Sequence, residues 1–161
     1  MMDCYFVAKY LHILCSTVLF GTGIGTAFQM VWAMHLSRKG RVETVHSVVC
    51  GVVLADWIFT TPAGIIQPAT GLWLIYLQGW ALTESWLIAT YALYFIALVC
   101  WLPVVHLQIK IRNLAAQALE TASPLPDEAF RLFKIWFFLG WPAFLGLTGI
   151  FWLMITKPQL F

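Results

Sequence analysis

Four long stretches of the sequence contain almost no Asp, Glu, Lys or Arg. None of these residues occurs in 10–37, 85–109 or 135–156, and Asp56 is the only one in 44–83. Each stretch is longer than the roughly 20 apolar residues that cross a bilayer, and a backbone in lipid must satisfy its own hydrogen bonds, which favours helices. The sequence therefore predicts an all-α polytopic membrane protein. We expect a bundle of four transmembrane helices, at about 6–35, 45–78, 86–112 and 130–156, in a single membrane domain over 1–161.

The amino-acid composition agrees with lipid as the main solvent. Apolar residues make up 61% of the chain and charged residues 10%, whereas a soluble domain carries about 25% charged residues. So few charges cannot cover a surface that faces water, which excludes a soluble enzyme and a nucleic-acid-binding protein. The partner that the composition predicts is the lipid bilayer, and not a nucleic acid.

Basic residues gather at one end of the predicted bundle. Those in or beside the connections after the first and third spans are Arg38, Lys39, Arg41, Lys110, Arg112, Arg131 and Lys134, whereas Lys9 and Lys157 lie at the other end. Because cytoplasmic loops are enriched in Lys and Arg, this asymmetry predicts that both termini lie outside. Both basic connections are then expected to face the cytoplasm.

Prolines and one polar segment interrupt the predicted helices. Pro62 and Pro68 lie inside the second span, where a proline removes a backbone hydrogen bond and bends a helix. We therefore expect a kinked second helix, whose bend either only shapes the bundle or opens a pocket. The segment 113–129 is expected to hold a short interfacial helix on the cytoplasmic side and a proline-rich turn. A new helix is expected to begin at Asp127–Glu128, where acidic side chains suit the helix dipole.

His12 is the histidine that we expect within the apolar layer. At 1.5 Å per residue it lies about 9 Å below the outer end of the first span, and an ionisable group at such a depth is a functional candidate. Gln67 and Thr70 of the second span are expected at a similar depth, and either can hydrogen-bond to the imidazole. Three interpretations stay open: a histidine satisfied by these neighbours, a haem ligand, or a proton relay.

Asp56 is the other costly residue in a predicted span. If the short outer turn fixes the register, Asp56 lies near the inner edge of the membrane, level with His106 and near Arg131 and Lys134. That placement predicts a structural polar cluster with an ion pair. If the second span crosses in an earlier register, Asp56 instead rises to the depth of His12 and can pair with it.

Several short runs resemble a known family over almost the whole chain. They are Tyr10-Leu11-His12, Leu54-Ala55-Asp56-Trp57, Phe59-Thr60-Thr61-Pro62, Gln67-Pro68-Ala69-Thr70-Gly71, Trp101-Leu102-Pro103-Val104-Val105 and Gly140-Trp141-Pro142-Ala143-Phe144. These runs are similar to the bacterial integral-membrane family called domain of unknown function 2269. The resemblance implies a multi-pass protein of the bacterial cytoplasmic (inner) membrane. In that membrane the distribution of basic residues predicts that both termini are periplasmic.

A remoter resemblance is to the HemJ-type protoporphyrinogen oxidases, small membrane proteins that bind haem b. The matching residues are His12, Pro62-Ala63, Gly71-Leu72-Trp73-Leu74, Trp86, Arg131, Pro142 and Lys157-Pro158. By this resemblance His12 is the haem ligand. The HemJ pattern also has a lysine shortly after the tryptophan, and no basic residue occurs between Leu87 and Leu93. The resemblance therefore implies haem binding more than protoporphyrinogen oxidation.

Two hypotheses about function follow from these residues. The first is a membrane protein that binds haem b for redox or haem-handling work, with His12 on the iron and Met154 as the candidate second ligand. Ser16 and Gly23 share the helical face of His12 and leave it flat enough for a porphyrin, while Gln67 and Thr70 lie opposite. The alternative is a non-enzymatic membrane module that binds a lipid or another small hydrophobic molecule. Such a module could also act as a homodimer or as an accessory subunit of a membrane complex.

Overall fold

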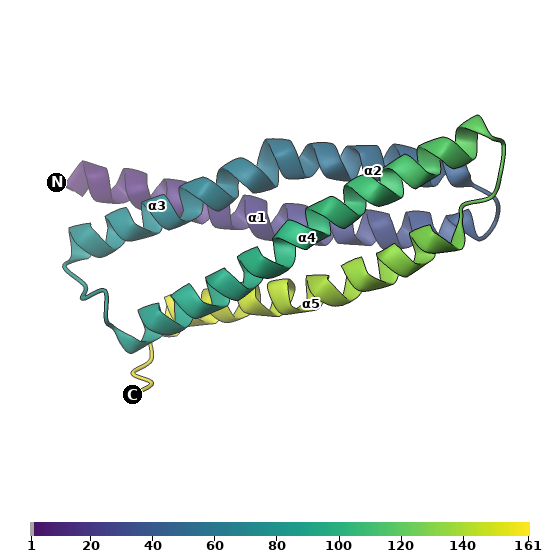
Figure 1. Ribbon diagram of the computed structural model, residues 1–161. Helices are drawn as coiled ribbons and strands as arrows, with labels where there is room; N and C mark the ends of the chain where they lie inside the picture. Colours follow the sequence, from purple (N-terminus) through teal and green to yellow (C-terminus); the bar gives the residue numbers. More distant parts are fainter. Residues whose placement is uncertain (1) are drawn as a thin grey trace.

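The chain folds into helices joined by short turns. The computed structural model describes residues 2–161 and contains, in order, α1 (Met2–Ser37), α2 (Val42–Ala55), the π-helical turn η1 (Asp56–Thr60), α3 (Thr61–Gln78), α4 (Ser85–Glu120) and α5 (Asp127–Thr156). Four rods result, because α2, η1 and α3 continue one another without a break (Figure 1). Each rod is long and apolar enough to cross a membrane. The predicted all-α architecture with four spans is thereby confirmed.

The rods alternate in direction, which brings the two termini to the same end of the bundle (Figure 1). We name this end the terminal end; it also holds the turn 79–84. The opposite end is the basic end, where the turns after α1 and α4 lie. Gly40 and Gly79 adopt φ angles of 79° and 69° in the turns that follow α1 and α3. Glycine tolerates this left-handed region without strain, so it can end a helix abruptly.

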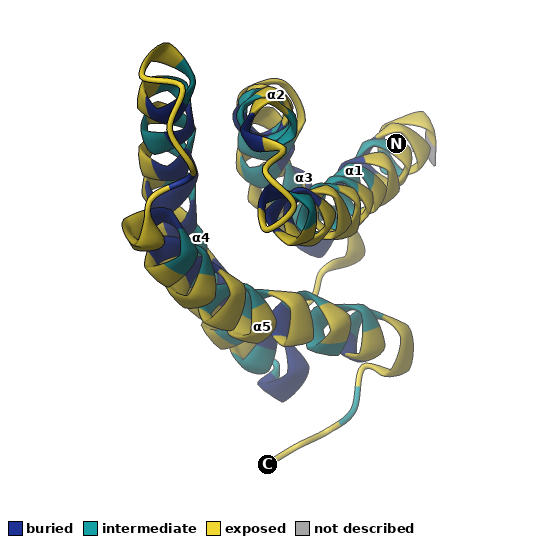
Figure 2. Ribbon diagram, turned by 90° about the vertical axis from the view of Figure 1, so that its right-hand side faces the viewer, coloured by how far each residue is buried: buried dark blue, intermediate teal, exposed yellow. Residues whose placement is uncertain are grey.

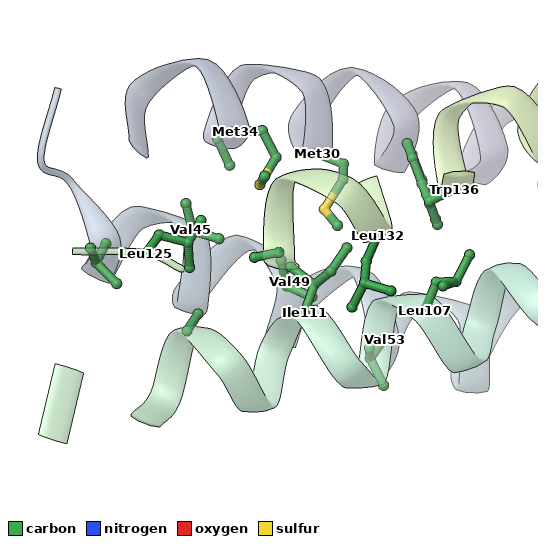
Figure 3. Close-up of a cluster of buried hydrophobic side chains, with 14 of the residues drawn as sticks. Met30, Met34, Val45, Val49, Val53, Leu107, Ile111, Leu125, Leu132 and Trp136 are labelled. Carbon is green, nitrogen blue, oxygen red and sulfur yellow. The ribbon is translucent and has the colours of Figure 1, made fainter. Parts of the chain in front are cut away.

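The main apolar core lies in the basic half of the bundle, and Figure 3 shows its side chains packed between the helices. Met30 of α1, Val45 and Val49 of α2 and Ile111 of α4 are fully buried there, and Leu132 of α5 packs with them. Lipid tails are as apolar as these side chains, so helices in a membrane associate mainly through close packing. This interdigitated cluster, to which all four rods contribute, therefore holds the basic half together.

Toward the terminal end the bundle separates into two helix pairs. α1 packs on α3 and α4 packs on α5, and the two pairs diverge from each other (Figure 1, Figure 2). Phe20 of α1 joins them near the middle, with its ring centroid 5.4 Å from that of Phe144 and 5.4 Å from that of Phe151. Beside the turn 79–84, a smaller apolar cluster connects α3, α4 and α5 through Ile75, Trp86, Leu87 and Leu153.

The second rod contains the interruption that its prolines predict. Over Asp56–Thr60 the helix widens into a π turn, in which the backbone N–H of Thr61 donates to the carbonyl of Asp56. The Thr61 hydroxyl donates to the same oxygen at 2.9 Å. Pro62 follows directly, and because a proline ring crowds the preceding helical turn, the wider turn accommodates it. π turns often occur at functional sites, so the residues of this turn become candidates.

The separate interfacial helix expected within 113–129 does not form. α4 continues unbroken to Glu120, so the first part of this segment belongs to the third rod. Ala115 and Ala118 are buried against the main core, and tertiary packing of this kind prolongs a helix that local sequence alone would leave marginal. The turn at 121–126 and the start of α5 at Asp127 agree with the prediction.

Candidate functional site

His12 of α1 is held against α3 in the terminal half of the bundle. Its Nδ1 lies 3.2 Å from the carbonyl oxygen of Gln67 and 3.0 Å from Thr70 Oγ1, and its Nε2 lies 3.2 Å from Gln67 Nε2. Both neighbours that the depth count gave to His12 are therefore in contact with it. The alternative register, with Asp56 at the depth of His12, is not the one adopted.

These contacts determine where the ring carries its proton. With the Gln67 side-chain amide oriented as it is in the structure, its nitrogen donates and His12 Nε2 accepts, so a neutral imidazole is protonated on Nδ1. Nδ1 then donates to the Gln67 carbonyl or to the Thr70 hydroxyl oxygen. The Thr70 hydroxyl donates in turn to the carbonyls of Ile66 and Gln67, at 2.9 and 3.0 Å. Gln67 Oε1 is buried and has no hydrogen-bond partner among the described residues.

Gly71 allows the imidazole to come this close to α3. A Cβ at Gly71 would lie 3.2 Å from His12 Cε1 and 3.7 Å from His12 Nδ1. The first distance is shorter than ordinary carbon contacts, so a larger residue would push the ring away from the α3 backbone. The Gln67-Pro68-Ala69-Thr70-Gly71 run thus supplies one turn of helix that fits a histidine.

A second contact across the bundle lies one turn from His12. Pro68 has no N–H, so the carbonyl of Gly64, four residues earlier, loses its partner within α3. The hydroxyl of Tyr94 on α4 donates to this carbonyl. In lipid a freed carbonyl must find a partner on a neighbouring helix, and Tyr94 meets that need. The contact links α3 of one helix pair to α4 of the other.

The other residues predicted to hold a cofactor do not gather around His12. Ser16 Oγ donates to the carbonyl of Ile13 on its own helix, at 2.7 Å. A Cβ on Gly23 would meet no atom within 4 Å, so the space in front of that residue is open. Met154 packs against the small apolar cluster beside the turn 79–84.

A haem fits this arrangement only in part. The hydrogen bond from Nδ1 to a backbone carbonyl is the kind that orients a metal-bound histidine. However, the Gln67 amide occupies Nε2, the nitrogen that iron would need. Among the same residues there is no group of three or more His, Cys, Asp or Glu side chains that could hold a metal ion.

Asp56 lies at the first position of the π turn and is 5% exposed. Thr60 Oγ1 donates to its carboxylate at 2.8 Å, and the Gln108 side chain of α4 approaches the same carboxylate. Gln108 is 2% exposed, and its Oε1 has no partner in the described part of the chain. Asp56 and Gln108 therefore form a polar contact across the bundle, near the level of the membrane that the outer-turn register predicts.

The structure does not bring Asp56 together with the basic residues of the predicted polar cluster. Arg131 instead approaches Glu128 of its own helix at 4.0 Å, and both side chains are exposed. His106 and Lys134 are exposed as well. The prediction of an ion pair at Asp56 is therefore wrong. The basic side chains stay on the surface, where water can reach them, while Asp56 points inward to Gln108.

Two site residues were not found from the sequence, although each had a signal. Tyr94 is not among the candidates taken from the sequence, yet Pro68 already implies a free carbonyl at Gly64. Gln108 was overlooked, yet it is the only Asn or Gln in the uncharged stretch 85–109. In both cases a polar group in an apolar span was the clue, because such a group needs a partner.

Comparison with known proteins identifies one family. A family model described as a predicted integral membrane protein (DUF2269) matches residues 6–158, almost the whole chain. No curated protein and no solved structure matches the chain. The likeness to HemJ-type oxidases stays a prediction.

Proposed function

The chain belongs to the DUF2269 family of predicted integral membrane proteins, and from this premise we propose that it binds a small hydrophobic molecule beside His12 and Gln67. The observation that carries the proposal is the buried Gln67 Oε1, which has no hydrogen-bond partner within residues 2–161. A buried polar atom without a partner costs free energy. A ligand with a hydroxyl or another hydrogen-bond donor would satisfy this oxygen.

The surrounding helices support a lipid-facing site for the apolar part of such a ligand. The α1/α3 and α4/α5 pairs diverge in this half of the bundle (Figure 2). Tyr91 lies one turn from Tyr94 on the same face of α4 and is 39% exposed, which agrees with the separation of the pairs. The open space in front of Gly23 also supports a site that faces lipid. Spaces between the helices of a bundle are common ligand sites.

We also propose that the protein lies in the bacterial cytoplasmic membrane, with the terminal end of the bundle in the periplasm. The support is the concentration of Lys and Arg at the basic end, since such residues are retained on the cytoplasmic side. The His12 site then lies in the periplasmic half of the bilayer. A molecule that partitions into the outer leaflet of this membrane could reach the site from the side.

Haem b is the second candidate ligand. The observation in its favour is the bond between His12 Nδ1 and the Gln67 carbonyl, which would hold the imidazole in place for a metal. His12 could offer Nε2 only after the Gln67 amide moved away. A bound haem would supply redox chemistry, and Gln67 and Thr70 would orient the histidine.

One preparation tests both ligands. Protein purified in mild detergent from haem-replete cells is examined by absorption spectroscopy, and its organic extract by mass spectrometry. We expect no Soret band and one copurifying hydrophobic molecule, present in near-equal amount to the chain. This molecule should be lost from Gln67→Leu and His12→Leu and kept in Thr17→Ala, a matched control on an exposed face of α1.

The other outcomes are equally clear. A Soret band that disappears in His12→Leu would replace the proposed ligand by haem b. If the extract of the wild-type protein is identical to that of Gln67→Leu, and the wild-type protein shows no Soret band, ligand binding at this site is refuted. Circular dichroism of each variant checks that the helices are intact.

A further inference from the structure

Asp56 is an acidic side chain enclosed in an apolar part of the bundle. It is almost completely buried, while its sequence neighbours Leu54 and Trp57 expose more than half of their surface. Asp56 lies about 33 Å along the helix from Gln78, so it is close to the inner edge of the apolar layer. A charged side chain at such a position is expensive and usually has a functional reason.

The groups around the carboxyl are neutral oxygens and an amide. Thr60 donates to it from the same π turn, and the Gln108 side-chain amide approaches it from α4. The Gln108 side-chain oxygen, Oε1, is buried and has no donor in the part of the chain that the structure describes. The site therefore has more acceptors than donors, which is what a cation requires. Hard cations prefer oxygen ligands of these types.

No basic side chain faces the carboxyl from the elements packed against it. Within the described residues, α3 carries no Lys, Arg or His. α1 carries no Lys or Arg after Lys9, and α4 carries none before Lys110. The nearest titratable groups of α2 are Cys50 and His46, which contact each other at 3.6 Å. On α4 they are Cys100 and the exposed His106, and on α1 His12 is engaged with α3.

We propose that Asp56, Thr60 and Gln108 form a binding site for one monovalent cation, either a proton or Na⁺. A buried carboxylate needs a countercharge, and a bound cation supplies it where the protein does not. A proton would sit on the carboxyl of Asp56. Na⁺ would be held between this carboxylate and the oxygens of Gln108 and Thr60. The site lies at the π turn, so its occupancy is tied to the geometry of the second rod.

The test uses dicyclohexylcarbodiimide on the full-length protein in liposomes. This reagent is apolar and reacts with the protonated carboxyl: the carboxyl oxygen attacks the central carbon, the proton moves to nitrogen, and the adduct rearranges to a stable N-acylurea. Labelling is followed by peptide mass spectrometry across a pH series, with NaCl or choline chloride as the salt. We expect labelling at Asp56 that decreases as the pH rises.

The two cations give different results. Labelling that is equal in both salts identifies a proton site, whereas labelling that NaCl suppresses and choline chloride does not identifies a Na⁺ site. In the second case Gln108→Leu should abolish the protection by NaCl, because it removes one of the proposed ligands. Absence of labelling at Asp56 over the whole pH series in both salts overturns the proposal.

Infrared difference spectroscopy gives a second readout that does not require access by a reagent. The wild-type protein is compared with Asp56→Asn, which keeps the size of the side chain. A carbonyl band of a protonated carboxyl, or a carboxylate band that shifts between NaCl and choline chloride, should be present in the wild type and absent from the variant. Asp127→Asn, an exposed residue at the start of α5, is the control and should leave this band unchanged. A wild-type spectrum without either band also contradicts the proposal.

Discussion

The hydrogen bond between Tyr94 and Gly64 offers the sharpest test of how this bundle is held together. Tyr94→Phe removes only the hydroxyl, so the ring and its packing stay in place. The Gly64 carbonyl cannot turn to its own helix instead, because the residue four positions later is Pro68. The substitution therefore leaves a backbone oxygen without a donor in an apolar environment.

Two known magnitudes bracket the effect. Hydrogen bonds between membrane helices average about 0.6 kcal/mol in double-mutant cycles, whereas an orphaned buried acceptor costs about 1–3 kcal/mol. The second value applies here, since Pro68 removes the alternative donor. We expect Tyr94→Phe to lower the free energy of unfolding by about 1.5 kcal/mol, roughly a tenfold change in the folding equilibrium.

The assay is equilibrium unfolding in mixed micelles, with the fraction of a denaturing detergent as the variable. The same substitution is made in a Pro68→Ala background, where residue 68 regains an N–H that can satisfy the Gly64 carbonyl. There Tyr94→Phe should cost no more than about 0.6 kcal/mol. An equal cost in the two backgrounds would show that the proline does not create the need for Tyr94, and the reasoning would be refuted.

Two paired substitutions test the packing. Gly71→Ala should displace the His12 ring, because the new Cβ would lie 3.2 Å from His12 Cε1. Gly25→Ala should leave the ring in place, because a Cβ there would meet none of the described atoms within 4 Å. The ¹⁵N chemical shifts of the imidazole report the difference, and equal spectra for the two variants would argue against the contact. Ile111→Ala should cost about 2–5 kcal/mol, and Phe138→Ala, 71% exposed, less than about 0.5 kcal/mol, in the same unfolding assay. Similar losses for the latter pair would contradict the assigned core.

The spans and the level of His12 could be predicted because both depend on depth alone. An uncharged stretch of sufficient length can only be a helix in lipid, and a rise of 1.5 Å per residue fixes the level of each side chain. Adjacent spans joined by a short turn then place His12 opposite Gln67 and Thr70. The depth count gives the shared level of these residues, and the rotation of α1 and α3 then turns the side chains toward one another.

The partner of Asp56 could not be predicted, because a depth count gives no rotation. Gln108 and Lys134 are both compatible with the level of Asp56, and the structure selects Gln108 through the way α4 packs on the second rod. The end of α4 was missed for a related reason. Its last turns are helical because Ala115 and Ala118 pack on the core, and local sequence does not show what a helix will pack against.

Both polar sites arise from prolines in the same rod. Pro62 follows the π turn that begins with Asp56, and Pro68 frees the carbonyl that Tyr94 satisfies, next to Gln67. A regular helix hides its backbone groups from lipid, so it gives polar side chains on its neighbours nothing to bind. Pro68 breaks that rule at Gly64, where Tyr94 of α4 satisfies the freed carbonyl, whereas beside Pro62 the polar group that faces α4 is the Asp56 side chain. The second rod therefore supplies the polar groups of both candidate sites in an otherwise apolar bundle, with one site near each face of the membrane.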